Sequence, residues 1–131
     1  MELIIVVVII GVIAGFAIPS YQKTMVRQQV RKAFMNVHII AGAQEIYKAR
    51  NGRYWCDFMS LDCFDLNSIN TNLKISIIPD NNIDYTTYAQ TGSEDKFFTV
   101  AVGVVGDPFM LSADSPPLNI VCSNILMNVC P

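Results

Sequence analysis

The hydrophobic pattern divides the chain into an apolar segment, an amphipathic segment and a mixed remainder. Residues 3–19 contain no charged or hydrogen-bonding side chain, and twelve of these 17 residues are Leu, Ile, Val or Phe. A helix that is apolar on all sides is typically surrounded by lipid or by other helices, and about 17 apolar residues are the lower limit for spanning a bilayer. We therefore expect residues 1–21 to form a transmembrane or filament-core helix.

A secretory signal peptide is the alternative interpretation of this apolar run. Such a peptide begins with positive residues and ends at a small-residue cleavage site. Here the acidic Glu2 precedes the run, and Pro19 and Tyr21 lead into a basic helix. This order favours a helix that remains in the mature chain.

Small residues inside the run predict close packing and local weakness. Gly11 and Gly15 lie one turn apart, a spacing that lets helix backbones approach closely. Glycine lowers helix propensity and Pro19 lacks a backbone N–H, so residues 11–19 are expected to bend or melt most easily; simple tolerance of these residues in a membrane helix is the alternative. Glu2 is either a solvated acid at the helix start or a charge held for a partner.

Residues 22–53 are expected to continue the helix with an amphipathic pattern. Apolar residues recur at steps of three and four, the helical period; they are Val26, Val30, Ala33, Phe34, Val37, Ile40, Ala41, Ile46 and Tyr47. Lys23, Arg27 and Arg31 lie four residues apart on a polar face, and Gly52 supplies the stop. The two segments together predict a helix of about 50 residues, roughly 75 Å long. The remaining chain is too small to cover that length.

Residues 54–131 predict a small α+β head. Residues 55–72 are expected to form a loop with a short helical segment, and the chain after residue 105 is expected to be irregular and Pro-rich. Segments rich in β-branched and aromatic residues, separated by turn residues, predict strands; they are residues 73–78, 83–89 and 96–105. The expected fold class is α+β: a long helix with a protruding apolar half, packed on an antiparallel sheet of three or four strands.

Charge is distributed unevenly along the chain. Residues 1–55 contain seven Lys and Arg against two acids, whereas residues 56–131 contain two Lys and nine acids. The net charge is −2, which gives no overall basic character to favour a specific nucleic-acid partner. The single histidine, His38, argues against a multi-histidine metal site or a Ser-His-Asp enzyme. We expect no cofactor, no metal and no catalytic site, and assign His38 a surface or packing role, with a pH switch as the alternative.

Four cysteines lie in the head: Cys56, Cys63, Cys122 and Cys130. Their spacing differs from the close Cys-x₂-Cys spacing of zinc and redox motifs. An even number in a small head favours disulfides and an oxidising compartment. Of the three possible pairings we favour the local pairs Cys56–Cys63 and Cys122–Cys130, with a four-cysteine zinc site as the alternative.

The N-terminal 21 residues resemble a known family. Glu2, the apolar run with Gly11 and Gly15, and the Pro19-Ser20-Tyr21 ending are similar to the N-terminal signature of type IV pilins and type II secretion pseudopilins. The head is similar only in kind. In the family the conserved acid is the fifth residue of the mature chain, whereas here it is the second, so neither the cleavage site nor the methylated residue is assigned.

The resemblance implies a subunit that polymerises through its N-terminal helix. It implies assembly roles for Glu2, Gly11, Gly15, Pro19 and Tyr21, with Glu2 pairing with the N-terminal amine of a neighbouring copy and the stretch around Gly11 to Pro19 losing helical order in the filament. The implied partners are other copies of the chain, membrane lipid before assembly, a prepilin peptidase and the inner-membrane assembly machinery. The implied location is the inner membrane, followed by an extracellular filament.

Three functions within this family remain open. The first is a major pilin of a type IV pilus serving adhesion, motility or DNA uptake; the second is the major pseudopilin of a type II secretion system; the third is a minor, priming or tip subunit. Major pseudopilins usually have a calcium-binding acidic loop instead of a C-terminal disulfide. Asp107 and Asp114 are compatible with such a loop, but Cys122 and Cys130 favour the pilin. An enzyme and an electron-conducting filament are the alternatives from other classes.

Overall fold

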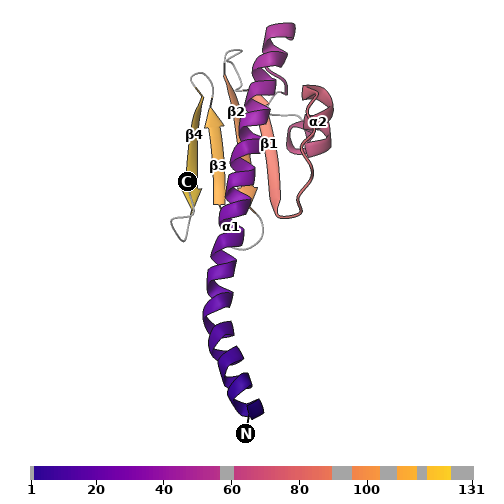
Figure 1. Ribbon diagram of the computed structural model, residues 1–131. Coiled ribbons are helices and arrows are strands. Elements are labelled where there is room, and N and C mark those ends of the chain that lie inside the picture. Colours follow the sequence, from indigo (N-terminus) through magenta and orange to yellow (C-terminus); the bar gives the residue numbers. More distant parts are fainter. Residues whose placement is uncertain (1, 57–60, 90–95, 104–108, 115–117, 125–131) are drawn as a thin grey trace.

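One long helix forms the axis of the molecule and extends well beyond the head (Figure 1). The computed structural model describes residues 2–56, 61–89, 96–103, 109–114 and 118–124, without the side chains of residues 2, 16–20, 22, 23, 61 and 124. Helix α1 spans Glu2–Asn51, 50 residues, which confirms the length expected from the sequence. The expected α+β class is also confirmed, because a four-stranded antiparallel sheet packs on the C-terminal half of α1.

A glycine in the left-handed region ends α1, as the sequence predicts. Gly52 has φ +76°, and its N–H donates to the carbonyl of Lys48 at 2.8 Å. Only glycine adopts this conformation without a side-chain penalty, so it is the usual residue just after a helix end.

Among the described side chains of α1, the buried row lies on one face and in the C-terminal half of the helix. The buried row advances in steps of four and three and contains Val26, Val30, Ala33, Val37, Ile40 and Gln44. This row packs against β1, β2 and β3. Ile46, which belongs to the apolar pattern expected from the sequence, lies outside the buried row, because its side chain is 57% exposed. At 100° per residue Ile46 lies about 160° around the helix axis from Val30 and about 120° from Ile40, so it cannot share their face.

The sheet is a simple meander in the order β1-β2-β3-β4. Its strands are β1 (Ile83–Ala89), β2 (Phe97–Gly103), β3 (Phe109–Asp114) and β4 (Asn119–Asn124). One row across the sheet runs from Tyr85 through Ala101 and Leu111 to Cys122. Alternate residues of β1, β2 and β3 are buried beneath α1, which is the period-2 pattern of a sheet with one covered face.

The strand expected at residues 73–78 is wrong. A short 3₁₀ turn, η1 (Leu61–Phe64), and helix α2 (Leu66–Leu73) precede this segment, and α2 takes its first residue. The Asn70 side chain then occupies both backbone groups of Ile77: its Nδ2 donates to the Ile77 carbonyl at 2.8 Å, and its Oδ1 accepts from the Ile77 N–H at 2.9 Å. The N–H and carbonyl of Ile77 are therefore not available for hydrogen bonds to a neighbouring strand.

The expectation of irregular chain after residue 105 is also wrong. β3 and β4 both lie in this region and complete the sheet. In β3 the alternation is clear, since Phe109, Leu111 and Ala113 are buried while Met110 and Asp114 are exposed. The strands escape notice because each includes polar residues on its solvent face.

Candidate functional site

The N-terminal part of α1 is an exposed apolar surface, which we call the arm (residues 3–15). Its ten large aliphatic side chains are between 52% and 82% exposed. These side chains point in all directions around the helix axis, because consecutive residues advance by 100°. Among the described elements, no strand or second helix lies beside this part of α1 (Figure 1). Such an area is far larger than the scattered apolar residues of an ordinary surface, so it marks an interaction site.

Within the described part of the chain, no helix combines the length and the hydropathy needed to cross a membrane.

The five residues expected to act in assembly lie along α1 and do not converge on one point. Glu2 is the first residue of the helix, and Pro19 is inside it. Gly11 and Gly15 are exposed, and a Cβ added at either would meet nothing within 4 Å. Tyr21 is 65% exposed. α1 is continuous past Gly11, Gly15 and Pro19 in the single chain; the loss of helical order expected in a filament stays a prediction.

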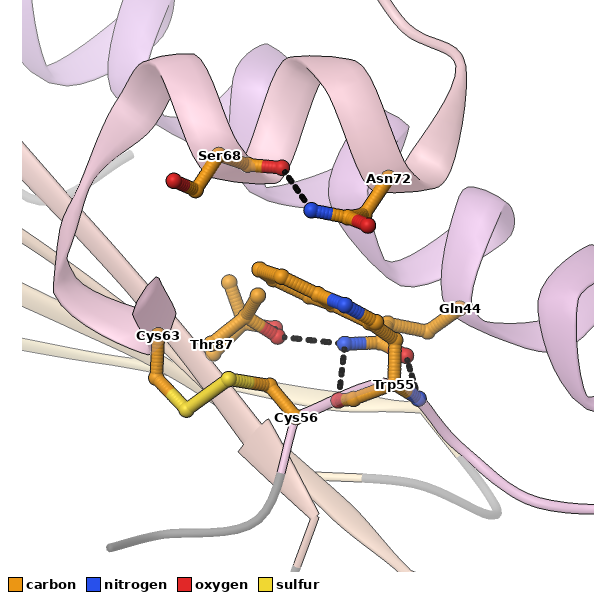
Figure 2. The surroundings of a disulfide bond; sticks show 8 residues. Gln44, Trp55, Cys56, Cys63, Ser68, Asn72 and Thr87 are labelled. Atoms are coloured by element: carbon orange, nitrogen blue, oxygen red, sulfur yellow. Dashed lines mark hydrogen bonds between the residues drawn. A yellow bond between two sulfur atoms is a disulfide. The ribbon is translucent and has the colours of Figure 1, made fainter. Parts of the chain in front are cut away.

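A buried polar centre joins α1 to the head (Figure 2). Gln44 is fully buried; its Nε2 donates to the Trp55 carbonyl at 3.2 Å and to Thr87 Oγ1 at 3.0 Å, and its Oε1 accepts from the Trp55 N–H at 2.9 Å. Thr87 in turn shares a hydrogen bond of 2.9 Å with Thr99 on β2. The centre therefore fixes α1 to the post-helix loop and to two strands. The sequence analysis missed it, and its only signal is a glutamine in the apolar row of α1.

A disulfide lies directly beside this centre (Figure 2). Cys56 and Cys63 are bonded, as expected, and Cys63 is fully buried. Cys56 has φ +71°, unusual for a residue with a side chain. The disulfide and a hydrogen bond from the Ala89 N–H to the Cys56 carbonyl, at 2.6 Å, hold the residue in this conformation. Cys122 on β4 is also disulfide-bonded; Cys130, its expected partner, lies outside the described residues.

Removal of the Cys56–Cys63 bond is expected to destabilise the head. We predict that the double variant Cys56→Ala, Cys63→Ala loses about 2.5 kcal/mol of unfolding free energy, because a short closed loop restricts the unfolded chain by about that amount. Urea unfolding followed by Trp55 fluorescence measures the loss, with the unreduced native chain as the reference. An unchanged urea midpoint would contradict the prediction.

A single salt bridge among the described residues ties α1 to the turn before β1. Lys32 Nζ donates to Asp80 Oδ2 at 2.7 Å, and the Asn82 N–H donates to Asp80 Oδ1 at 3.1 Å. The bond from Lys32 is the main cause that lowers the pKa of Asp80 below its usual 3.8. Lys32 is 46% exposed, so we expect the pair to contribute less than about 1 kcal/mol.

The pair gives the head a small acid sensitivity. The pKa of Asp80 is lower in the folded chain than in the unfolded chain, so its contribution is fully present above about pH 4 and is lost as the pH falls below that value. We expect the unfolding free energy of Asp80→Asn, measured by urea unfolding, to fall less between pH 6 and pH 3 than that of the native chain. The matched control is Asp84→Asn, at an exposed position on β1; an equal effect of both variants would contradict the assignment.

The described residues contain little that resembles a catalytic or metal site. His38 is exposed and lies edge-to-face with Phe34, with ring centroids 4.7 Å apart. No group of three or more His, Cys, Asp or Glu in the described ranges could hold a metal ion. A hollow of about 290 Å³ is lined partly by Asp65, Asp80 and Asp84. Of these, Asp65 accepts the N–H of Ser68 at the start of α2, and Asp80 is bonded to Lys32, so two carboxylates already have structural partners.

No protein-family model matches the chain, and comparisons with curated proteins and with solved structures find no match. The exposed arm and the head are therefore the features that bear on function.

Proposed function

We propose that this chain is the major pilin of a bacterial type IV pilus, a structural subunit that polymerises through α1 into an extracellular filament. The observation that carries the proposal is the arm, whose large apolar side chains are all more than half exposed. Full burial of one such side chain is worth about 1.5–3 kcal/mol. Burial of the arm therefore provides a large driving force for association.

The position of the arm supports an open polymer over a closed dimer. The arm lies at one end of α1 and the head at the other, so the two parts present different surfaces (Figure 1). A contact between different surfaces leaves one free copy of each surface on every complex. Such contacts add subunits without limit unless the rotation closes a ring.

The stable head supports the role of a durable building block. Its buried polar centre fixes α1 to the sheet, and the Cys56–Cys63 disulfide joins the loop after α1 to η1. A subunit of this kind can pass from one environment to another as a rigid body while only the surroundings of the arm change. In the proposed cycle, a prepilin peptidase processes the chain and the arm rests in inner-membrane lipid. The assembly machinery then moves it into a filament that serves adhesion, motility or DNA uptake.

Electron microscopy of cells that express the chain tests the proposal. We expect micrometre-long filaments with one repeated subunit, identified by labelling with an antibody against the head. The control is Val8→Asp, which places a charge in the arm. Short filaments that form only on overproduction would favour the major pseudopilin of a type II secretion system. A folded chain that forms no filament under either condition would contradict the proposal.

A further inference from the structure

A second apolar row lies on α1 within the head region, on the side that faces away from the sheet. It consists of Met35, Ile39, Gly42 and Ile46, which we call the outer row. Met35 is 68%, Ile39 49% and Ile46 57% exposed, and a Cβ added at Gly42 would meet nothing within 4 Å. The steps of four, three and four place these residues on one face, opposite the buried row. The sequence analysis missed this row because it placed Ile46 in a single apolar pattern with the residues of the buried row.

The charges beside the outer row restrict what can cover it. Arg27 and Arg31 precede it and Arg50 follows it, and all three are exposed. The salt bridge found among the described residues uses none of them. An identical helix at the same height would place like charges against each other, which is unfavourable. The arm contains no charged residue and is apolar on every side, so it can cover the row without this repulsion.

We infer that the outer row of one copy binds the arm of a second copy, with the two helices parallel and Gly42 packed against the turn between Gly11 and Gly15. This inference rests on the proposed function and names the contact by which copies join. Glycines on both sides let the two backbones approach closely, as small residues do where helices pack. The large side chains of the outer row, Met35, Ile39 and Ile46, then pack on the aliphatic side chains of the arm.

The register of this contact follows from residue numbers. Gly42 is 31 residues from Gly11 and 27 residues from Gly15, so the second copy is displaced by about 40–47 Å along the helix axis at 1.5 Å per residue. The buried row of α1 runs only from Val26 to Gln44, about 27 Å by the same measure. The displacement exceeds this length, so the two sheets do not compete for the same height.

The register also predicts an ion pair between copies, in place of the pairing of Glu2 with a neighbour's N-terminal amine that the family resemblance implies. It places Glu2 of the second copy at the height of residues 29–33 of the first, next to Arg31. The acid at the start of the arm and the cations before the outer row are therefore complementary in this arrangement. A copy placed at equal height would instead keep Glu2 and Arg31 almost 30 residues apart, about 43 Å.

Cysteine cross-linking in assembled material tests the contact. The described cysteines are all disulfide-bonded, so introduced thiols report without interference from them. We mix chains with Gly42→Cys and chains with Gly11→Cys or Gly15→Cys, oxidise the mixture, and expect dimers from at least one of the two combinations. The double variant Gly11→Cys, Gly42→Cys is expected to give a ladder of higher oligomers. The control mixture, Gly11→Cys with Ala49→Cys, displaces the thiols by seven residues and is expected to give about tenfold fewer dimers.

A charge exchange gives an independent readout. Arg31→Glu is expected to lower the Gly11–Gly42 cross-link yield about tenfold, and adding Glu2→Arg to the same chain is expected to restore it. Sedimentation first establishes whether the chain self-associates. If filaments form but the highest cross-link yield comes from a single variant such as Gly42→Cys alone, this contact is overturned and the proposed function stands. The same holds if filaments form and neither glycine mixture gives cross-linked dimers. A chain that does not self-associate would overturn both.

Discussion

A single acidic residue in the middle of the arm, Val8→Asp, is expected to abolish filament assembly and leave the head folded. Val8 is 59% exposed in the single chain and becomes buried in the proposed assembly. A carboxylate at the centre of an apolar helix in a bilayer costs roughly 2.5–3.5 kcal/mol. If the filament core has a similar polarity, each contact weakens by about 100-fold. The fraction of chain that sediments after detergent removal measures the loss.

The matched control separates the position of the charge from the charge itself. Ser76→Asp adds the same group at an exposed position in the loop after α2, where we expect assembly to remain unchanged. Urea unfolding of both variants is expected to give native midpoints, because neither residue lies in the core of the head. Normal assembly of Val8→Asp would contradict the role of the arm.

The largest loss of stability is expected at the buried polar centre, from Gln44→Ala. The variant removes three hydrogen bonds and leaves the Trp55 N–H and carbonyl without their partner in the core. A buried polar group without a partner costs about 1–3 kcal/mol, and the missing side chain leaves a cavity as well. We expect a loss of roughly 3–4 kcal/mol, measured by urea unfolding with Trp55 fluorescence.

Two further variants define the source of this loss. Gln28→Ala changes an exposed glutamine on the same helix, and we expect a shift within about 0.5 kcal/mol. Thr87→Val removes one partner of Gln44 but leaves both bonds to Trp55, so an intermediate loss is expected. A loss from Gln44→Ala no larger than that from Gln28→Ala would show that the centre contributes little to the fold.

Local patterns in the sequence predict some elements well and others poorly. The helix over Glu2–Asn51 follows from an uninterrupted apolar run and the helical period that continues it, and the strand over Ile83–Ala89 follows from β-branched and aromatic residues between clear turn residues. The segment after Leu73 has β-branched residues, yet the capping of α2 and the hydrogen bonds of Asn70 override that preference. β-propensity describes how well a residue fits a sheet that already exists, so tertiary contacts can cancel it.

The candidate site divides in the same way. The arm is evident from the sequence because an uncharged run of this length is rare and needs no partner to be recognised. The outer row is not evident, because periodicity alone does not say which of two apolar faces on α1 meets the sheet. Gln44 is hidden for another reason: the value of a polar residue in an apolar row depends on groups at Trp55 and Thr87, which only the fold brings together.

The continuity of α1 has a mechanical consequence for a filament of the proposed kind. Tension along the filament would load the backbone of this one helix, since α1 runs through both the arm and the head. The strands and the disulfide lie beside this load path and would carry little of the force. Pro19 has no N–H to donate to the carbonyl of Gly15, so one rung of the helical ladder is missing there. Elongation under load would therefore begin at this turn, and the heads would keep their shape while the filament extends.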